Sequence, residues 1–409
     1  MSAVAGLRGT GDWSTDERPK SFREMILWRE QRGSAPVLAL SSKAQKEAVS
    51  DPEFSWWDEP LGIVRLQVVG SHAAGITTIV VDSADPSTSA PGINWGTASH
   101  LVAGDLLMRE DTVENAGYTN EILEVVQVLS DTQFIVSRGA ANTTAATINN
   151  DDYLTLIGNA FAEGTSAPAA VSRNPMKFSN LCQIFKTSYE ITGTADVTTV
   201  RTGDTRKNDK KRRMWDHARA IEMAILWGKK YETTGTNGKP KRYTGGIRSQ
   251  IPSTNVTIWS AAVSAFDFFD ATYKVFDFDS PAGDERILFC GNTFLNELNK
   301  IVMSSGEMSW GPMVTQFGLN LTSLRMPQGT LFLRTHPIFN QHSQWKKSGM
   351  ILDFSALRWR YTQGRDTQFK DDVQNKDEDV RRGFWFTEGG VELWYGGLTC
   401  AYLSNLSAT

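Results

Sequence analysis

The segment from Lys177 to Gly228 carries the clearest pattern of hydrophobic and polar positions in the chain. From Phe178 to Ile191, β-branched and aromatic residues alternate roughly with polar ones, which is the period of a half-buried strand. Thr192-Gly-Thr-Ala then interrupts the alternation. Asp204 is a good N-cap, and a helical pattern continues from it to Trp227. We therefore predict a strand, a turn and a long helix that ends at Gly228.

The predicted helix has two different halves. Met214, Ala218, Ile221 and Ile225 recur at helical spacing, so they form one apolar stripe that faces a core. The preceding turns are strongly basic. Their cations are Arg206, Lys207, Lys210, Lys211, Arg212 and Arg213. The second half is thus expected to anchor the helix, while the basic half projects toward solvent, a neighbouring subunit or a polyanion.

The first 60 residues have the pattern of an arm and not of a compact domain. One helix is predicted over Lys20–Arg32 and a second short helix over Ser41–Val49, on extended linkers. Such an arm buries its apolar residues only by lying on the body of its own chain or on a neighbour. Its candidate contact residues are Phe22, Met25, Ile26, Trp56 and Trp57.

Residues 61–160 are rich in predicted β-strands. Their clearest feature is a hairpin that turns near Ser130 and Asp131. Short apolar runs separated by turn residues suggest a small barrel or sandwich. The runs are Ile76–Val81, Leu106–Arg109, Glu121–Val128, Gln133–Arg138 and Tyr153–Ile157.

The rest of the chain is predicted to hold a mixed unit and then a β-rich end. Residues 261–345 alternate between helices at Ala262–Phe276 and Asn292–Met303 and strands at Arg286–Cys290 and Thr330–Arg334. Strands that follow one another closely are expected to pair as antiparallel neighbours. At the C-terminal end these are Gly349–Phe354, Leu357–Tyr361, Arg382–Glu388 and Val391–Tyr395.

Composition limits the class of protein. A chain of 409 residues is expected to form two or three structural units. The formal net charge of −4 gives no general polyanion signal, so a nucleic-acid contact would have to be local. Three widely spaced cysteines, Cys182, Cys290 and Cys400, argue against a disulfide framework and favour a reducing compartment. With no signal-peptide pattern and no apolar run of about 18 residues, neither secretion by that route nor a membrane span is expected.

A search for catalytic and ligand-binding motifs finds little. The sequence has no phosphate-binding loop, dinucleotide fingerprint or nucleophile elbow, and its five histidines lack the spacing of a metal-binding helix. Asp277 and Asp279 could hold a divalent ion, but a loop cap is the favoured interpretation. Paired carboxylates far apart in the chain stay open. We expect no catalytic, cofactor-binding or metal site.

Two charge runs complete the inventory. The basic run 206–213 and the mainly acidic run 370–379 have two interpretations. Either each run is a solvated face, or the two runs pair by opposite charge across a contact between subunits. Such pairing would set the orientation of the two subunits more than their affinity.

Several short phrases occur in a characteristic order and spacing. They are Gln183-Ile-Phe, Ile191-Thr-Gly-Thr, Ile221-Glu-Met-Ala-Ile-Leu-Trp-Gly, Thr244-Gly-Gly-Ile and Thr387-Glu-Gly-Gly-Val-Glu-Leu. In these phrases the chain resembles one subgroup of the major capsid proteins of tailed bacteriophages, which share the fold named after phage Hong Kong ninety-seven. The resemblance covers most of residues 170–405.

This resemblance implies an α+β fold with named parts. Residues 1–60 would be the N-terminal arm, and residues 61–203 an extended β loop that carries a small β-barrel-like insertion at about 72–160. Residues 204–261 would form the spine helix of the peripheral domain and its following loop. Residues 262–345 would form the axial domain, and residues 346–409 the strands shared by the peripheral and axial domains.

The resemblance also implies a function. The family self-assembles into pentamers and hexamers of an icosahedral shell that encloses double-stranded DNA, in the host cytoplasm and without enzymatic activity or cofactors. Portal, scaffold and decoration proteins are further partners that it implies. Three alternatives stay open: an encapsulin-like compartment shell, a phage tail or receptor-binding module, and, last, a glycan hydrolase.

Overall fold

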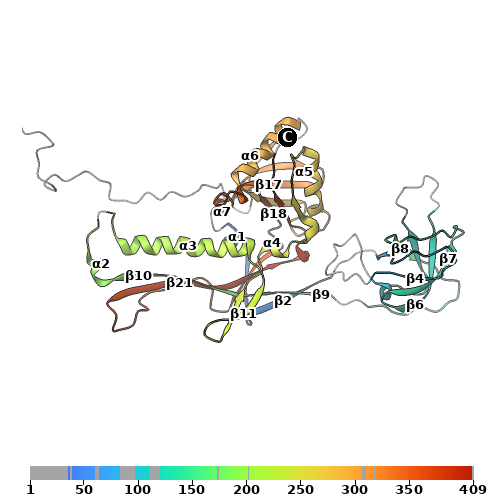
Figure 1. Cartoon of the computed structure of the whole chain (residues 1–409), viewed down its shortest axis with the longest axis horizontal. Helices are drawn as coiled ribbons and strands as arrows, with labels where there is room; N and C mark the ends of the chain where they lie inside the picture. The colour runs from blue at the N-terminus through green and yellow to red at the C-terminus, as the bar shows by residue number, and fades with distance from the viewer. Residues whose placement is uncertain are drawn as a thin grey trace, which may run out of the picture.

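The computed structural model describes residues 36, 39–59, 64–82, 97–110, 120–172, 175–200, 202–305, 310–316 and 319–407. Figure 1 shows a long helix along an extended sheet, a second sheet with helices above one end of that helix, and a third sheet beyond a two-stranded ribbon. This mixed architecture agrees with the predicted α+β class. The helix predicted over Lys20–Arg32, with Phe22, Met25 and Ile26, lies outside the described residues.

Helix α3 spans Thr205–Trp227, as predicted. Local chemistry sets both ends: the Asp204 carboxylate accepts a hydrogen bond from the Lys207 amide (3.0 Å), and the Gly228 amide donates to the Ala224 carbonyl. The predicted core stripe is wrong at Met214, which is 47% exposed. Helices α1 (Ala39–Lys43) and α7 (Pro337–Asn340), which pack above the helix, lie over its second half only (Figure 1).

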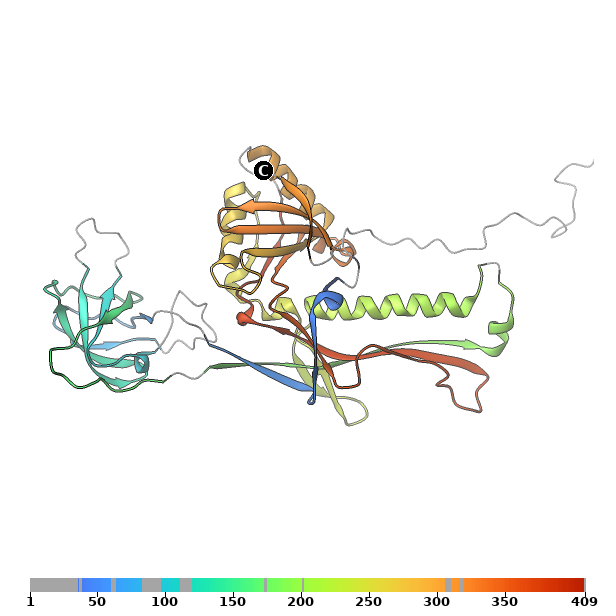
Figure 2. The same ribbon diagram turned by 180° about the vertical axis from the view of Figure 1, so that it is seen from behind.

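The sheet beneath α3 has the strand order β1-β19-β21-β10, with β20 also paired to β21 (Figure 2). The predicted strands Arg382–Glu388 and Val391–Tyr395 are one continuous strand, β21. The helix predicted over Ser41–Val49 is wrong beyond Lys43, because the chain there becomes β1 and pairs in parallel with β19. This distant backbone ladder overrides the local helical pattern. The bounds are β1 Gln45–Val49, β10 Gln183–Thr192, β19 Leu357–Thr362, β20 Gln368–Lys370 and β21 Val380–Leu393.

A second sheet has the order β13-β22-β18-β14-β17-β16-β15. Its predicted elements at residues 262–334 and 349–354 are present, but β18 pairs with β14 and β22 and lies in a different sheet from β19. The predicted pairing of these two consecutive strands is therefore wrong. The strands are β13 Val256–Ile258, β14 Glu285–Cys290, β15 Trp310–Gln316, β16 Leu319–Met326, β17 Gly329–Thr335, β18 Gly349–Leu352 and β22 Ala401–Ser404.

The two faces of this second sheet enter two different cores. Helices α5 (Ala265–Thr272), its 3-10 extension Tyr273–Phe276 and α6 (Asn292–Ser305) cover one face, where Phe268, Phe294 and Leu298 pack on Leu288. The alternate residues Ile287 and Phe289 face the other way and join a cluster that includes Ile221 and Ile225 of α3. The end of α3 and the second sheet therefore share one core.

A two-stranded ribbon, β2 (Glu53–Asp58) with β9 (Met176–Leu181), leads away from both larger sheets (Figure 2). The single strand predicted from Phe178 to Ile191 is thus two strands. They separate at Cys182, where the chain changes its pairing partner from β2 to β21. The Cys182 amide still donates to the carbonyl of Pro52, the residue before β2 (2.7 Å). The remaining short elements are the hairpin β11 Tyr231–Thr234 with β12 Pro240–Tyr243, the helices α2 Gly193–Val197 and α4 Ile247–Gln250, and the 3-10 turns Ser253–Asn255, Trp345–Lys347 and Tyr395–Gly397.

The third sheet is formed by the predicted β-rich region 61–160, with the order β3-β8-β5-β6-β7-β4. Its predicted strands and the hairpin turn near Ser130 are confirmed, whereas β3 was not predicted. Just beyond the edge strands β3 and β4, Val68 and Val81 form an isolated β-bridge. This bridge joins the two edges of the sheet around a core that contains Leu107 and Phe134. The bounds are β3 Arg65–Gln67, β4 Thr78–Val80, the 3-10 turn Ala98–His100, β5 Asp105–Arg109, β6 Ile122–Ser130, β7 Gln133–Ala140 and β8 Tyr153–Asn159.

Candidate assembly surfaces

The basic half of α3 begins with a contact inside its own chain. The guanidinium of Arg206 lies 3.2 Å from the Asp371 carboxylate and 3.8 Å from that of Asp372. Its Nε also donates to the hydroxyl of Tyr189 (3.4 Å), which in turn donates to Asp371 (2.7 Å). The hydrogen bond with Tyr189, and then the Asp371 charge, raise the pKa of Arg206. The basic and acidic runs therefore meet within one subunit at this point.

The other predicted basic residues divide into two sets by position on the helix. Lys210 follows Arg206 by four residues and places its Nζ 3.7 Å from the centre of the Phe369 ring, on the side of the strands. The exposed set is Lys207, Lys211, Arg212 and Arg213. Within it, Arg212 and Arg213 lie 3.5 and 3.4 Å from Asp209 and Asp216. Such exposed ion pairs contribute little to the stability of the fold.

Two polar residues in the second half of α3 were missed by the sequence pattern. His217 is buried against the paired strands β10 and β21, with its Nδ1 3.2 Å from the Thr187 hydroxyl and its Nε2 2.8 Å from the Thr387 hydroxyl. Glu222 is fully buried and accepts a hydrogen bond from the Leu40 amide (3.0 Å). Burial lowers the pKa of His217. The hydrophobic periodicity of the helix does not reveal these two residues, because it assigns polar positions to the exposed surface.

The ribbon presents two different faces. Trp56 stacks between Phe54 and Phe178, at ring distances of 6.1 and 6.0 Å, so one face is an aromatic ladder. Trp57 points to the opposite face and is 62% exposed. A two-stranded ribbon is at best marginally stable alone in water. This ribbon thus has an outer aromatic side chain that the described part of its own chain leaves uncovered.

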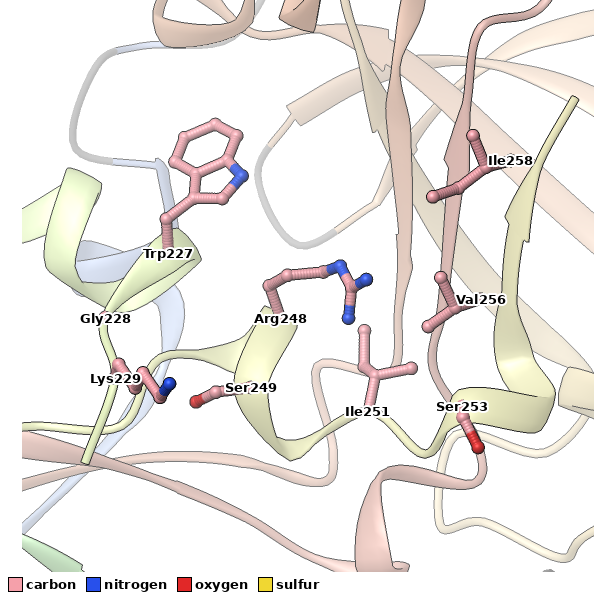
Figure 3. A pocket seen from close by; sticks show the side chains of 9 residues that line it. All are labelled: Trp227, Gly228, Lys229, Arg248, Ser249, Ile251, Ser253, Val256 and Ile258. Atoms are coloured by element: carbon pink, nitrogen blue, oxygen red, sulfur yellow. The ribbon is translucent and has the colours of Figure 1, made fainter. Parts of the chain in front are cut away.

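A shallow groove of about 770 Å³ lies at the C-terminal end of α3 (Figure 3). The Arg248 guanidinium stands above Ile251, with Trp227 on one side and Val256 on the other. Trp227 is fixed by stacking on Trp345, at 4.0 Å between ring centres. We call this the α3-end groove. Its lining residues are Trp227, Gly228, Lys229, Arg248, Ser249, Ile251, Ser253, Val256 and Ile258.

The described residues give little support for metal or thiol chemistry. No group of three or more His, Cys, Asp or Glu residues that could hold a metal ion occurs among them. The three cysteines are buried, and burial raises the pKa of the Cys182 thiol to about 11 and that of Cys400 to about 12. Asp279 lies in the loop before β14, as does Asp277, whose pKa burial raises. In the described part of the chain, no helix combines the length and apolarity needed to cross a membrane.

Comparison with known proteins decides between the open alternatives. A family model described as SU10 major capsid protein matches residues 25–406. The chain belongs to the SU10 major capsid protein family. One relative, from Pseudomonas phage PaMx41, is named "Major capsid protein". It is 28% identical to this chain over 415 residues, and the match covers 99% of this chain and 94% of the relative.

Several solved structures are similar to this SU10-family protein. The capsid of a native GTA particle has a TM-score of 0.47 and 9% identity and covers 98% of each chain. Microbacterium phage Oxtober96 gives a TM-score of 0.44 with 10% identity over 96% of each chain. An encapsulin from Synechococcus elongatus PCC 7942 gives a TM-score of 0.38 with 10% identity and covers 58% of this chain and 77% of its own.

Membership of this family confirms the predicted resemblance and the predicted role as a phage major capsid protein. The SU10-family chain is a major capsid protein of a phage, and its place is the virion capsid, where it associates with copies of itself. The basic half of α3, the ribbon and the α3-end groove are therefore candidate surfaces for contacts between copies.

Proposed function

We propose that this capsid protein forms the pentamers and hexamers of an icosahedral shell that is assembled in the host cytoplasm and encloses double-stranded DNA. The observation that supports this most directly is the ribbon of β2 and β9, with its uncovered Trp57. A ribbon whose outer face is left exposed by the described part of its chain gains stability when a neighbour covers that face. A subunit built this way is completed by assembly.

The described sheets fit the division into parts that the family resemblance suggests. We assign the sheet beneath α3 to the peripheral domain, the sheet covered by α5 and α6 to the axial domain, and the ribbon to the extended loop. In this assignment the β-rich insertion, with its Val68–Val81 bridge, is a small closed barrel at the end of that loop. The part of residues 1–60 that precedes β2 serves as the arm. Portal, scaffold and decoration proteins are its further partners.

Packaged DNA is assigned to the exposed basic set of α3. Lys207 and Lys211 are four residues apart and share one side of the helix, next to Arg212 and Arg213. Clustered cations attract phosphate without reading sequence, which is the kind of contact a container needs. Arg206 and Lys210 are held against their own chain by Asp371 and Phe369 and act in the fold instead.

The assembly proposal is tested by expressing the chain alone and beside the other structural proteins of its phage. Purified material is analysed by size-exclusion chromatography and negative-stain microscopy. Closed shells, or rings of five and six subunits, are the expected result. A stable trimer in both preparations would contradict the proposal and favour a tail or receptor-binding module.

The DNA proposal is tested by reversing charge on the exposed set. A Lys207→Glu, Lys211→Glu, Arg213→Glu variant should form shells that retain less nuclease-protected DNA than the wild type. The matched control is Lys241→Glu, Lys347→Glu, Lys376→Glu, which changes the net charge equally at exposed lysines elsewhere. Full genomes in particles of the first variant would exclude this contact. Wild-type shells without any protected DNA would favour an encapsulin-like compartment.

A further inference from the structure

We propose that Trp57 of one copy inserts into the α3-end groove of a second copy. This inference rests on the proposed shell function and names the residues through which neighbouring subunits contact each other. It joins two features that the described chain leaves incomplete: an uncovered tryptophan and an unfilled aromatic groove.

The ribbon of β2 and β9 places the Trp57 side chain on its outer face. Residues alternate between the two faces of a strand, so Trp57 lies on the outer face, while Trp56 and Asp58 share the inner face. Glu59 is exposed and makes no ion pair with any described residue. The ribbon therefore presents an indole on its outer face and, just past the end of β2, an exposed carboxylate.

The α3-end groove has the complementary chemistry. Ile251, Val256 and Ile258 form an apolar wall, and Ile258 is 62% exposed. Across from this wall stands the Trp227 ring, already fixed by Trp345 (Figure 3). A pre-fixed ring loses little freedom when a second ring packs on it, which favours binding. The apolar part of the groove thus suits an aromatic side chain.

The charged part of the groove is cationic. Lys229 is exposed and forms no ion pair with a described residue, while Arg248 stacks over the Tyr402 ring at 4.7 Å. Among the described residues that line the groove, none is acidic. Glu59 beside Trp57 matches this charge, and such complementarity fixes the orientation of a docked segment.

The occupant must come from another copy. On its own chain, Trp56 and Phe178 line the adjoining depression of about 390 Å³, which meets the groove at Lys229 and Ser249. The inner face of the ribbon is thus the one directed to its own groove region. Trp57 follows Trp56 in the same strand and points the opposite way, so it cannot reach that region without breaking β2.

The experiment places a photo-crosslinker at the ribbon, as Trp57→p-benzoylphenylalanine, in assembled particles. Irradiation and mass spectrometry should recover peptides from residues 247–258 joined to residue 57. Particles made from isotope-labelled and unlabelled chains show whether the link joins two copies. The matched control is Ile184→p-benzoylphenylalanine, an exposed position (49%) on β10, which should not label that segment.

A charge exchange gives a second readout. Lys229→Glu should lower the yield of particles at least severalfold, and adding Glu59→Lys should restore most of it, while Trp57→Phe should assemble and Trp57→Ala should not. Normal particles whose crosslinks map to another segment, such as residues 1–35, would overturn this inference and leave the shell function standing. Absence of any oligomer from the wild type would overturn both.

Discussion

The guanidinium of Arg206 lies 3.2 Å from the carboxylate of Asp371, across 165 positions of sequence. The contact ties the first turn of α3 to the loop that follows β20. Tyr189 of β10 joins the same cluster through its hydroxyl. The start of the helix is therefore held by a side chain of β10 and a side chain of the loop after β20, in addition to its N-cap.

Removing this contact should destabilise the fold slightly and measurably. Arg206→Ala is expected to lower the free energy of unfolding by about 1 kcal/mol, because the pair is partly exposed and is reinforced by Tyr189. Chemical denaturation of Arg206→Ala, Asp371→Ala and the double variant gives the coupling between them. Lys207→Ala, which removes an exposed cation one residue away, serves as the control. Equal effects of Arg206→Ala and Lys207→Ala would show that the contact does not form.

The second half of α3 should dominate its anchoring. Ile225 is 1% exposed and packs in the core shared with the second sheet. Ile225→Ala is expected to cost about 2–5 kcal/mol of unfolding free energy, because it leaves a cavity there. Met214→Ala, on the exposed part of the helix, should change it by less than about 0.5 kcal/mol. Thermal denaturation of both variants compares them, and similar losses would place Met214 in the core after all.

The end of α3 depends on a close approach of two backbones. A methyl group at Gly246 would lie 2.5 Å from the Gly228 amide nitrogen and 2.6 Å from the Ala224 carbonyl oxygen. Backbone atoms cannot yield as a flexible side chain does, so Gly246→Ala should lower the free energy of unfolding by about 1–3 kcal/mol. Gly75→Ala is the control, since nothing lies within 4 Å of that position. A melting temperature of Gly246→Ala equal to that of Gly75→Ala would contradict the contact.

His336 should make the protein sensitive to acid. Burial lowers the pKa of His336 to about 4, from an ordinary value of 6.5. Between about pH 6.5 and pH 4 the unfolded chain binds a proton at His336 and the folded chain does not. The free energy of unfolding is therefore unaffected by His336 above about pH 6.5, and it falls as the pH drops below that value. From pH 7 to pH 5 the loss is about 2 kcal/mol.

The test for this effect is His336→Asn, because asparagine can still cap α7 through the Ile338 amide, as the His336 ring does. Urea denaturation at pH 7 and pH 5 should show a smaller difference for the variant than for the wild type. His342→Asn changes an exposed histidine nearby and should keep the wild-type difference. An unchanged difference in His336→Asn would assign the acid sensitivity to other groups.

Local sequence signals predicted what local chemistry determines. The ends of α3 follow from Asp204 and Gly228, and both were predicted to the residue. Strand β1 was predicted as helix because its partner β19 lies more than 300 positions away, and no local pattern reports that ladder. Met214 was placed in the core because periodicity gives the side of a helix but not how far the covering elements extend along it.

The candidate surfaces were predictable only in part. The basic run was visible as composition, but its division into residues held by the chain and residues left exposed depends on where Asp371 and Phe369 are brought by β20. The α3-end groove was not predicted at all. Its residues fall in three segments of the region 227–258, and the stacking of Trp227 on the distant Trp345 shapes it.

Strand β21 gives the subunit a preferred mechanical direction. Along one edge it is paired with β10 from Gln183↔Gly389 to Thr192↔Val380, and along the other it meets β20 and then β19. Its hydrogen bonds run perpendicular to the strand. A pull along β21 therefore loads them together in shear, whereas a pull across it opens them one by one. A shell wall stretched from inside resists best where this strand lies along the line of tension.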